Sequence, residues 1–309
     1  MEVKRLITAF LSMIRWTNLV FILLTQALFY YCIDLPLDIQ PFPLSRMIWL
    51  MAASVFIAAA GYIINDYFDL NIDRINKPGK NVIDHVISRR WAIFWHLTLS
   101  VMGIIATLVA VSFHKWYLVI ANAVCVLLLW LYSTSFKRQY LIGNIVISLL
   151  TAWTVLVIFF AEVPFSAAFG AHTYSVTRFF KAAFLYGGFA FIISLIREAL
   201  KDVQDIKGDI RYGCKTLPIV SGIHATKIYI GVWLVVLIAA LLILQLYMLQ
   251  LNWWLAIFYS IFFVILPLLY LFYKLWKAKT TKEFAYLSGL AKLIMLTGII
   301  TMVFFKVYF

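Results

Sequence analysis

Two groups of aspartates are the side chains of this sequence with the clearest chemical potential. They form two triplets with the same i, i+3, i+7 spacing: Asp66, Asp69, Asp73 and Asp202, Asp205, Asp209. On an α-helix this spacing places three carboxylates within about a 60° arc of one face. The chain contains 13 Asp and Glu residues in all, so the two triplets hold nearly half of its acidic side chains.

Carboxylates gathered in this way repel one another unless cations hold them together. Oxygen ligands without a neighbouring thiolate or imidazole suit Mg²⁺, which keeps several waters and shares its coordination shell with substrate phosphates. Two facing triplets therefore predict a pair of Mg²⁺ ions that bind a diphosphate between them.

The composition places this site in a membrane protein. Of the 309 residues 65% are hydrophobic and only 13% are charged, whereas soluble domains average about 45–50% and about 25%. Cys32, Cys125 and Cys214 lie far apart and show no metal-ligand spacing, so we interpret them as small packing residues.

Long, continuous apolar runs predict an all-α, polytopic membrane protein, because open sheet edges do not occur in lipid. We expect residues 1–309 to form a single transmembrane domain, one bundle of nine helices around a central cavity. Each aspartate triplet follows an apolar span, the second and the sixth, which suggests two divergent halves. The nine predicted spans are 16–33, 44–66, 91–113, 116–135, 141–161, 179–201, 225–248, 253–276 and 284–305.

The basic residues predict the orientation of the chain. Twenty of the 26 Lys and Arg residues fall in the N-terminal segment and in the loops that follow even-numbered spans. By the positive-inside rule, the N-terminus and both triplets face the cytoplasm and the C-terminus lies across the membrane, which we expect to be the plasma membrane. This topology accounts for much of the net charge of +13 without nucleic acid as a partner.

A diphosphate neutralised by metal ions and by Lys or Arg becomes a leaving group. The apolar surroundings indicate a lipid diphosphate, and an allylic prenyl chain fits best because its C–O bond ionises to a delocalised carbocation. A dry, helix-walled cavity protects such a cation from water, and aromatic faces stabilise it. The sequence thus favours an Mg²⁺-dependent transferase of prenyl groups.

Four segments resemble motifs of the UbiA superfamily of intramembrane prenyltransferases. They occur in the order of that family and together extend over essentially the whole chain. They are Arg15-x-x-Asn18, Asn65-Asp66-x-x-Asp69-x-x-x-Asp73, Tyr132-Ser-Thr-Ser-Phe-Lys137 with Gly143-Asn144, and Asp202-x-x-Asp205-x-x-x-Asp209 with its continuation to Pro218.

The resemblance implies a role for each matching residue. Asn65, Asp66, Asp69 and Asp73 would ligate or orient one Mg²⁺, and Asp202, Asp205 and Asp209 the other. Asp66, Asp69 and Asp205 would also be catalytic. Lys137 would reach the diphosphate oxygens, and Tyr132 would stabilise the reacting centre by a hydrogen bond or through its ring. Arg15, Asn18 and Lys201 would complete the substrate site.

The acceptor remains open at this stage. The Asp66–Pro78 segment most resembles the branch that transfers geranylgeranyl groups to geranylgeranylglyceryl phosphate, together with chlorophyll synthases. Arg138, Lys201, Arg211 and Lys215 are candidate ligands for an acceptor phosphate. The alternatives are an aromatic prenyltransferase of quinone or related biosynthesis, and, in another class, an ion-coupled transporter.

Two lysines have no assigned role. Lys292 lies inside the ninth predicted span, where a charge is costly and is often functional. Snorkelling, a counter-charge within the bundle and substrate binding are alternatives for it. Lys80 occupies a turn in which many members of the family have arginine, but the residues after it depart from the family pattern.

Overall fold

The computed structural model describes residues 2–37, 43–76, 83, 86–111, 115–163 and 174–308. Within these ranges the chain is helical and contains no strand, apart from one isolated bridge between Ile83 and Ile87. The all-α prediction is therefore confirmed for the described part of the chain.

Nine segments of the described chain are long and apolar enough to cross a bilayer, as the sequence predicted. They are Trp16–Leu37, Leu44–Asn76, Arg89–Ala110, Trp116–Thr134, Ile142–Glu162, Ser175–Gln204, Gly222–Gln250, Trp254–Lys277 and Thr281–Tyr308. Each overlaps one predicted span. The second and sixth extend beyond the predictions by several residues, which carries them past their apolar parts.

These spans are built from the following elements. The first comprises α2 (Trp16–Phe29), a π-turn (Tyr30–Asp34) and α3 (Leu35–Leu37), and α1 (Glu2–Met13) precedes it. The next five are α4 (Leu44–Asn76), α5 (Arg89–Ala110), α6 (Trp116–Thr134), α7 (Ile142–Glu162) and α9 (Tyr174–Gln204). After the short α10 (Ile206–Arg211) and α11 (Leu217–Val220) come α12 (Gly222–Gln250), α13 (Trp254–Ser260), α14 (Leu266–Lys277), α15 (Thr281–Ile300) and α16 (Val303–Tyr308).

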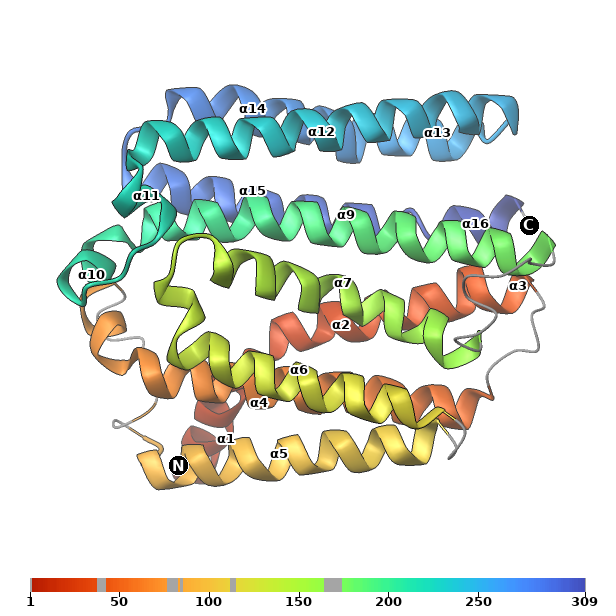
Figure 1. Ribbon diagram of the computed structural model, residues 1–309. Coiled ribbons are helices and arrows are strands. Elements are labelled where there is room, and N and C mark those ends of the chain that lie inside the picture. Colours follow the sequence, from red (N-terminus) through yellow and green to blue (C-terminus); the bar gives the residue numbers. More distant parts are fainter. Residues whose placement is uncertain are drawn as a thin grey trace.

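The long helices run side by side along one axis (Figure 1). Helix α9 packs against α7, α15 and α12, while α4 packs against α5, α6 and α2. The α2 helix joins the two groups through contacts with α4, α7 and α15. The N-terminus lies toward the end of the bundle that carries α10 and α11, and the C-terminus lies at the opposite end.

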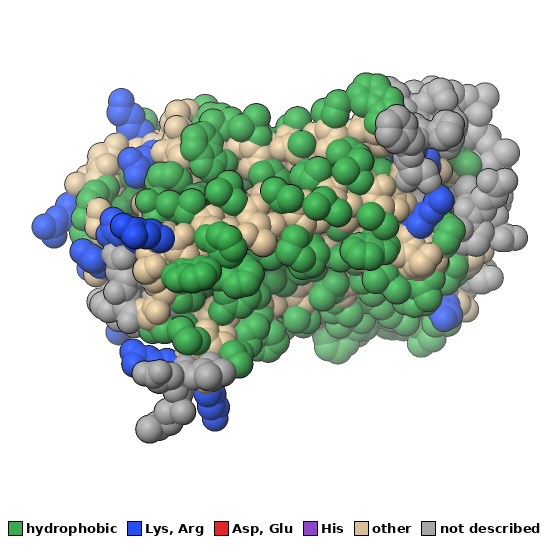
Figure 2. Space-filling model, turned by 90° about the horizontal axis from the view of Figure 1, so that it is seen from below, with side chains coloured by type: hydrophobic (Ala, Val, Ile, Leu, Met, Phe, Trp, Pro, Cys, Tyr) green, Lys and Arg blue, Asp and Glu red, His purple; other side chains and the backbone are tan. Residues whose placement is uncertain are grey.

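The outer surface matches a protein that is embedded in lipid. Figure 2 shows hydrophobic side chains along the length of the bundle, with Lys and Arg gathered toward its ends. Large apolar side chains on this surface, such as Leu97, Ile243 and Phe262, are more than half exposed. Soluble monomers rarely expose so large an apolar surface. The chain is therefore an integral membrane protein.

Two helices reach beyond the bilayer and carry the aspartate triplets. Helix α4 has 33 residues and α9 has 31, whereas about 20 suffice to cross the hydrocarbon core. Their last turns therefore lie at the same end of the bundle, the end beside α10 in Figure 1. We call it the acidic end.

The prediction that each triplet occupies one helical face is correct for the first triplet and wrong for the second. Asp66, Asp69 and Asp73 lie on the uninterrupted α4. Asp202 lies on α9, which ends at Gln204, and Asp209 lies on α10. Asp205 occupies the junction with φ −94° and ψ 4°, outside the helical region.

The packing of α15 on α9 depends on the absence of a side chain at Gly298. A Cβ there would lie 2.5 Å from the Phe189 ring, whereas a Cβ at Gly289 of the same helix would meet nothing within 4 Å. We expect Gly298→Ala to lower the free energy of unfolding by about 1–3 kcal/mol through overpacking. Gly289→Ala serves as the matched control and should not destabilise. Thermal unfolding in detergent compares the two, and equal melting temperatures would contradict the packing.

Candidate active site

A polar cavity of about 490 Å³ opens at the acidic end of the bundle. We call it the acidic cavity. It brings together the residues that the sequence nominated as metal ligands, catalytic groups and donor-substrate ligands, although these residues come from four separate segments. They are Arg15, Asn18, Asn65, Asp66, Asp69, Asp73, Tyr132, Lys137, Lys201, Asp202, Asp205 and Asp209.

Arg15 reaches the cavity from the break between α1 and α2. Its φ of 51° and ψ of 53° place it in the left-handed region, which few residues other than glycine adopt. The guanidinium Nη2 donates to Asp66 Oδ1 at 2.5 Å, and the guanidinium carbon lies 5.2 Å from the centre of the Tyr62 ring. Burial lowers the pKa of Arg15, but Asp66, Tyr62 and Asp73 together more than reverse this and raise the pKa overall, so Arg15 is a permanent cation.

Lys137 reaches the cavity from a 3₁₀ turn, Phe136–Arg138, that follows α6. Gly143, in the first turn of α7, permits this arrangement because a Cβ there would lie 2.7 Å from Lys137 Cα. The ammonium group forms an ion pair with Asp69, and both side chains are largely buried, with 14% and 10% exposed. Burial lowers the pKa of Lys137 to about 8, while the nearby Asp209 works in the opposite direction.

Two asparagines orient carboxylates of the two triplets. Asn65 Nδ2 donates to Asp69 Oδ2 at 2.9 Å within α4, and Asn144 Nδ2 of α7 donates to Asp202 Oδ2 of α9, also at 2.9 Å. Asn65 Oδ1 is buried and has no hydrogen-bond donor in the described part of the chain. A buried amide oxygen of this kind is costly and is a suitable ligand for a hard cation.

The two triplets are joined by a contact that the sequence analysis did not identify. The backbone N–H of Gly208 on α10 donates to Asn76 Oδ1 at the end of α4, at 2.8 Å. A Cβ on Gly208 would lie 2.6 Å from the Asn76 amide. This close contact between α10 and the end of α4 explains why the chain turns at Asp205 instead of extending α9. The only signal was an asparagine shortly before Pro78, at a position where a helix is expected to end.

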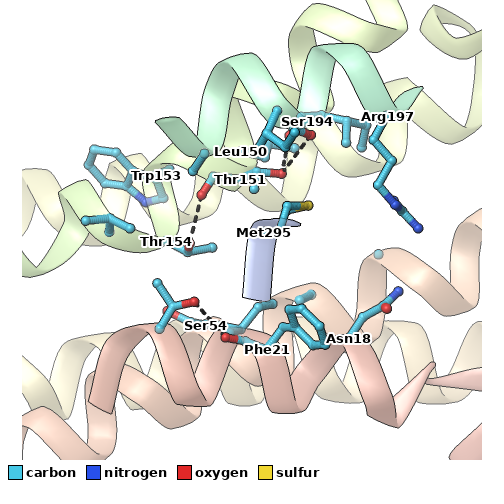
Figure 3. Close-up of a pocket in the computed structure, with 18 of the residues that line it drawn as sticks. Asn18, Phe21, Ser54, Leu150, Thr151, Trp153, Thr154, Ser194, Arg197 and Met295 are labelled. Atoms are coloured by element: carbon cyan, nitrogen blue, oxygen red, sulfur yellow. Dashed lines mark hydrogen bonds between the residues drawn. The ribbon is translucent and has the colours of Figure 1, made fainter. Parts of the chain in front are cut away.

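Beside the acidic cavity lies a second, mainly apolar cavity of about 250 Å³, between α2, α4, α6, α7, α9 and α15. We call it the apolar cavity; Figure 3 shows part of its lining. The two cavities share a set of wall residues, which we call the neck: Arg15, Asn18, Asn65, Tyr132, Arg197, Glu198 and Lys201. Polar and apolar parts of one ligand can therefore occupy adjoining spaces.

The neck is rich in cations. Glu198 Oε1 accepts from Lys201 Nζ at 2.6 Å and from Arg197 Nη1 at 3.2 Å. Lys292 of α15 lines the apolar cavity and donates to Asn18 Oδ1 at 2.7 Å. The sequence analysis left Lys292 without a role because its partner is 274 residues away. Arg197 and Glu198 were not among the predicted site residues.

The other nominated cations lie elsewhere. Arg138, Arg211 and Lys215 are exposed and line neither cavity. The backbone N–H of Lys215 donates to the Arg138 carbonyl at 2.7 Å. The segments that contain these two residues therefore contact each other through their backbones. Lys80 lies outside the described residues.

The donor atoms fit Mg²⁺ by chemical type. Carboxylate and amide oxygens dominate the acidic cavity, and the buried Asn65 Oδ1 supplies an acceptor that needs a partner. Among the described residues, no three His, Cys, Asp or Glu side chains stand close enough to hold an ion by themselves. An ion here would therefore be held by one or two carboxylates with water and phosphate oxygens, which is usual for Mg²⁺.

Sequence comparison relates the chain to prenyltransferases. The UbiA prenyltransferase family matches residues 38–296. Digeranylgeranylglyceryl phosphate synthase of Methanosphaera stadtmanae is 34% identical over 169 residues, which are 54% of this chain and 55% of that protein. The enzyme of the same name from Sulfurisphaera tokodaii is 31% identical over 196 residues, 63% of this chain and 64% of that protein. The chain thus matches between half and two thirds of the length of these relatives.

Structural comparison covers nearly the whole fold. A UbiA homologue from Aeropyrum pernix superposes with a TM-score of 0.61 and 18% identity, over 96% of this chain and 98% of that chain. A UbiA homologue from Archaeoglobus fulgidus bound to DMAPP and Mg²⁺ gives a TM-score of 0.57 and 15% identity, over 95% and 98%. At these identities the comparison establishes the shared helical membrane fold.

The acidic cavity predicts a stabilising effect of Mg²⁺ that is independent of turnover. Adding Mg²⁺ with inorganic diphosphate should raise the melting temperature of the purified protein, because a ligand of the folded state at about 100 times its Kd adds about 2.7 kcal/mol. The double variant Asp69→Asn, Asp205→Asn should lose this shift, whatever its melting temperature without ligand. KCl of equal ionic strength is the control. A shift of the same size in the double variant would contradict the site.

Proposed function

The chain belongs to the UbiA prenyltransferase family, and from this premise we propose that it is an Mg²⁺-dependent intramembrane prenyltransferase. The observation that carries the proposal is the pair of adjoining cavities. One gathers both aspartate triplets with Arg15 and Lys137, and the other is apolar and enclosed by membrane helices. A prenyl diphosphate has the same division into an anionic head and an apolar tail.

In the proposed reaction the acidic cavity binds the diphosphate head. Mg²⁺, when bound, neutralises the negative charge that develops as the diphosphate leaves. Asp69 and Asp66 form ion pairs with Lys137 and Arg15. We propose that these two cations turn to the diphosphate oxygens on binding, which frees the carboxylates for metal ions. Asn65, Asp73, Asp202, Asp205 and Asp209 complete the proposed ligand set.

The prenyl tail extends through the neck into the apolar cavity. Tyr132 lines both cavities, so its ring and hydroxyl would lie beside the carbon that loses the diphosphate. Phe21, Trp153 and Phe189 line the apolar cavity and offer aromatic faces to an allylic cation. The enclosed walls exclude water, which would otherwise capture the cation.

For the acceptor we propose geranylgeranylglyceryl phosphate, on the basis of the relatives named digeranylgeranylglyceryl phosphate synthase. The free hydroxyl of the acceptor attacks the first carbon of the prenyl group. A C–O ether bond forms, the bond from that carbon to the diphosphate breaks with its electron pair leaving on the diphosphate, and the hydroxyl proton passes to the released diphosphate. The alternative is an aromatic acceptor, in which a ring carbon attacks in place of the hydroxyl.

We also propose that the acidic end faces the cytoplasm, with the C-terminus across the plasma membrane. The excess of Lys and Arg in the segments and loops of the acidic end supports this orientation. The location of the aspartates also argues against an ion-coupled transporter. Transporters bind their coupling ions near the bilayer midplane on broken helices, whereas the first triplet follows the apolar part of a continuous α4.

Turnover with a panel of acceptors tests the proposed function. Purified protein would be incubated with radiolabelled geranylgeranyl diphosphate, Mg²⁺, and either geranylgeranylglyceryl phosphate or an aromatic acid. We expect labelled ether product with the first acceptor only, and none when EDTA replaces Mg²⁺. Transfer to the aromatic acid alone would select the alternative acceptor. Failure with every acceptor, in protein that melts cooperatively, would contradict the proposed activity.

Single substitutions test the contribution of each triplet to this reaction. Asp69→Ala and Asp205→Ala should each reduce turnover by roughly a hundredfold or more, because each removes a group that stabilises the departing charge. Asp205→Ala should remain fully stable because Asp205 is partly exposed, whereas Asp69→Ala should melt at a lower temperature because it leaves the largely buried Lys137 ammonium without this carboxylate. Initial rates at saturating substrate give the comparison, and thermal melting is the control. Wild-type rates in either variant would refute the two-sided site.

A further inference from the structure

We propose that the neck binds the phosphate monoester head group of the acceptor lipid, and that Lys292 selects acceptors that carry this phosphate. This inference rests on the proposed prenyl transfer and adds a second anion site to it. The first site, in the acidic cavity, takes the diphosphate of the donor. The second lies deeper in the membrane, where the acidic cavity meets the apolar one.

The neck and its surroundings carry more positive than negative charge. Arg197 and Lys201 of the neck and Lys292 beside it contribute three cations, and among the described residues Glu198 is the single carboxylate to which any of them is bonded. Arg15 is already matched by Asp66. Two positive charges therefore remain in excess at this level of the bundle. A phosphate monoester carries a charge of about −1.5 to −2 at neutral pH, which matches the excess.

The neck also contains a hydrogen-bond donor that no described residue of the protein uses. Arg197 Nε is buried and has no acceptor among the described residues. Lys292 is bonded to the neutral Asn18 Oδ1 and lies 5.0 Å from the centre of the Phe21 ring. In Figure 3, Arg197 points across the pocket toward Asn18 and Phe21 of α2. Donors from α9 and α15 thus converge on one space.

A cation at this depth needs a functional reason. Lys292 lies within the ninth span, twelve residues into a helix that begins at Thr281, and charged groups inside the membrane are costly and usually line substrate paths. A structural counter-ion role would require a buried carboxylate as its partner. The hydrogen-bond partner of Lys292 is instead the amide oxygen of Asn18, which leaves the charge of Lys292 available for a ligand.

The donor diphosphate is less suited to this space. Its charge is accommodated in the acidic cavity by Lys137, by the proposed metal ligands and by Arg15, which also forms part of the neck. An aromatic acid would bring one negative charge and leave one cation unmatched. A phosphate monoester lipid matches the excess charge of the neck, while the apolar cavity holds the prenyl tail of the donor. The neck therefore favours the phosphate-bearing class of acceptor.

The test compares Michaelis constants for the two substrates. Lys292→Gln should raise KM for geranylgeranylglyceryl phosphate by roughly tenfold or more, because a hydrogen bond between charged groups is lost. KM for geranylgeranyl diphosphate should stay unchanged, and Lys292→Arg should keep the acceptor KM near the wild-type value. The matched control is Lys282→Gln, which removes an exposed charge from the same helix α15. A rise in the donor KM instead would assign the neck to the diphosphate and overturn the inference.

A second arm uses only the wild-type protein, so it does not depend on the folding of a variant. The phosphate-free alcohol geranylgeranylglycerol should be a poorer acceptor than its phosphate ester, with kcat/KM lower by roughly tenfold or more. Equal kcat/KM values for the two would overturn the inference while leaving prenyl transfer intact. Absence of transfer to either would instead contradict the proposed function itself.

Discussion

The neutralisation of six aspartates at one end of a membrane bundle is the constraint on which the rest of the structure depends. Two carboxylates about 4 Å apart repel by about 4 kcal/mol at an effective dielectric constant of 20. Arg15 and Lys137 offset part of this repulsion through ion pairs with Asp66 and Asp69. The same two cations are those best placed to bind a diphosphate. Arg15 and Lys137 can therefore serve either as counter-ions of the aspartates or as ligands of the substrate.

Local backbone features hold these cations in place. The left-handed conformation at Arg15 ends α1 and begins α2, so the side chain enters the cavity from the membrane surface. Gly143 lets the turn that carries Lys137 lie directly against α7. In the same way, the absence of a side chain at Gly208 lets α10 lie directly against Asn76. Arg15 and Gly208 lie in segments between long helices, and Gly143 lies in the first turn of α7.

The sequence predicted much of this arrangement for physical reasons. Long, continuous apolar runs form helices in lipid, so the nine spans of the described residues were all predicted. The nominated metal ligands and donor-site residues share one cavity, whereas Arg138, Arg211 and Lys215 do not. The break at Asp205 was missed because i, i+3, i+7 spacing also fits a continuous helix, and the deciding contact, Asn76 with Gly208, is tertiary. The bond between Lys292 and Asn18 was missed for the same reason. The relation between the two halves as divergent repeats stays a prediction.

The central claim is that Lys137 and Arg15 exchange their carboxylate partners for a diphosphate while both triplets take up metal. A structure of the protein with Mg²⁺ and a non-hydrolysable prenyl thiodiphosphate tests it most directly. The account predicts metal ions on both sides of the diphosphate, one near Asp69 and one near Asp205, with Lys137 and Arg15 bonded to phosphate oxygens. A bound diphosphate with the Lys137–Asp69 pair still intact and no metal at Asp205 would contradict it.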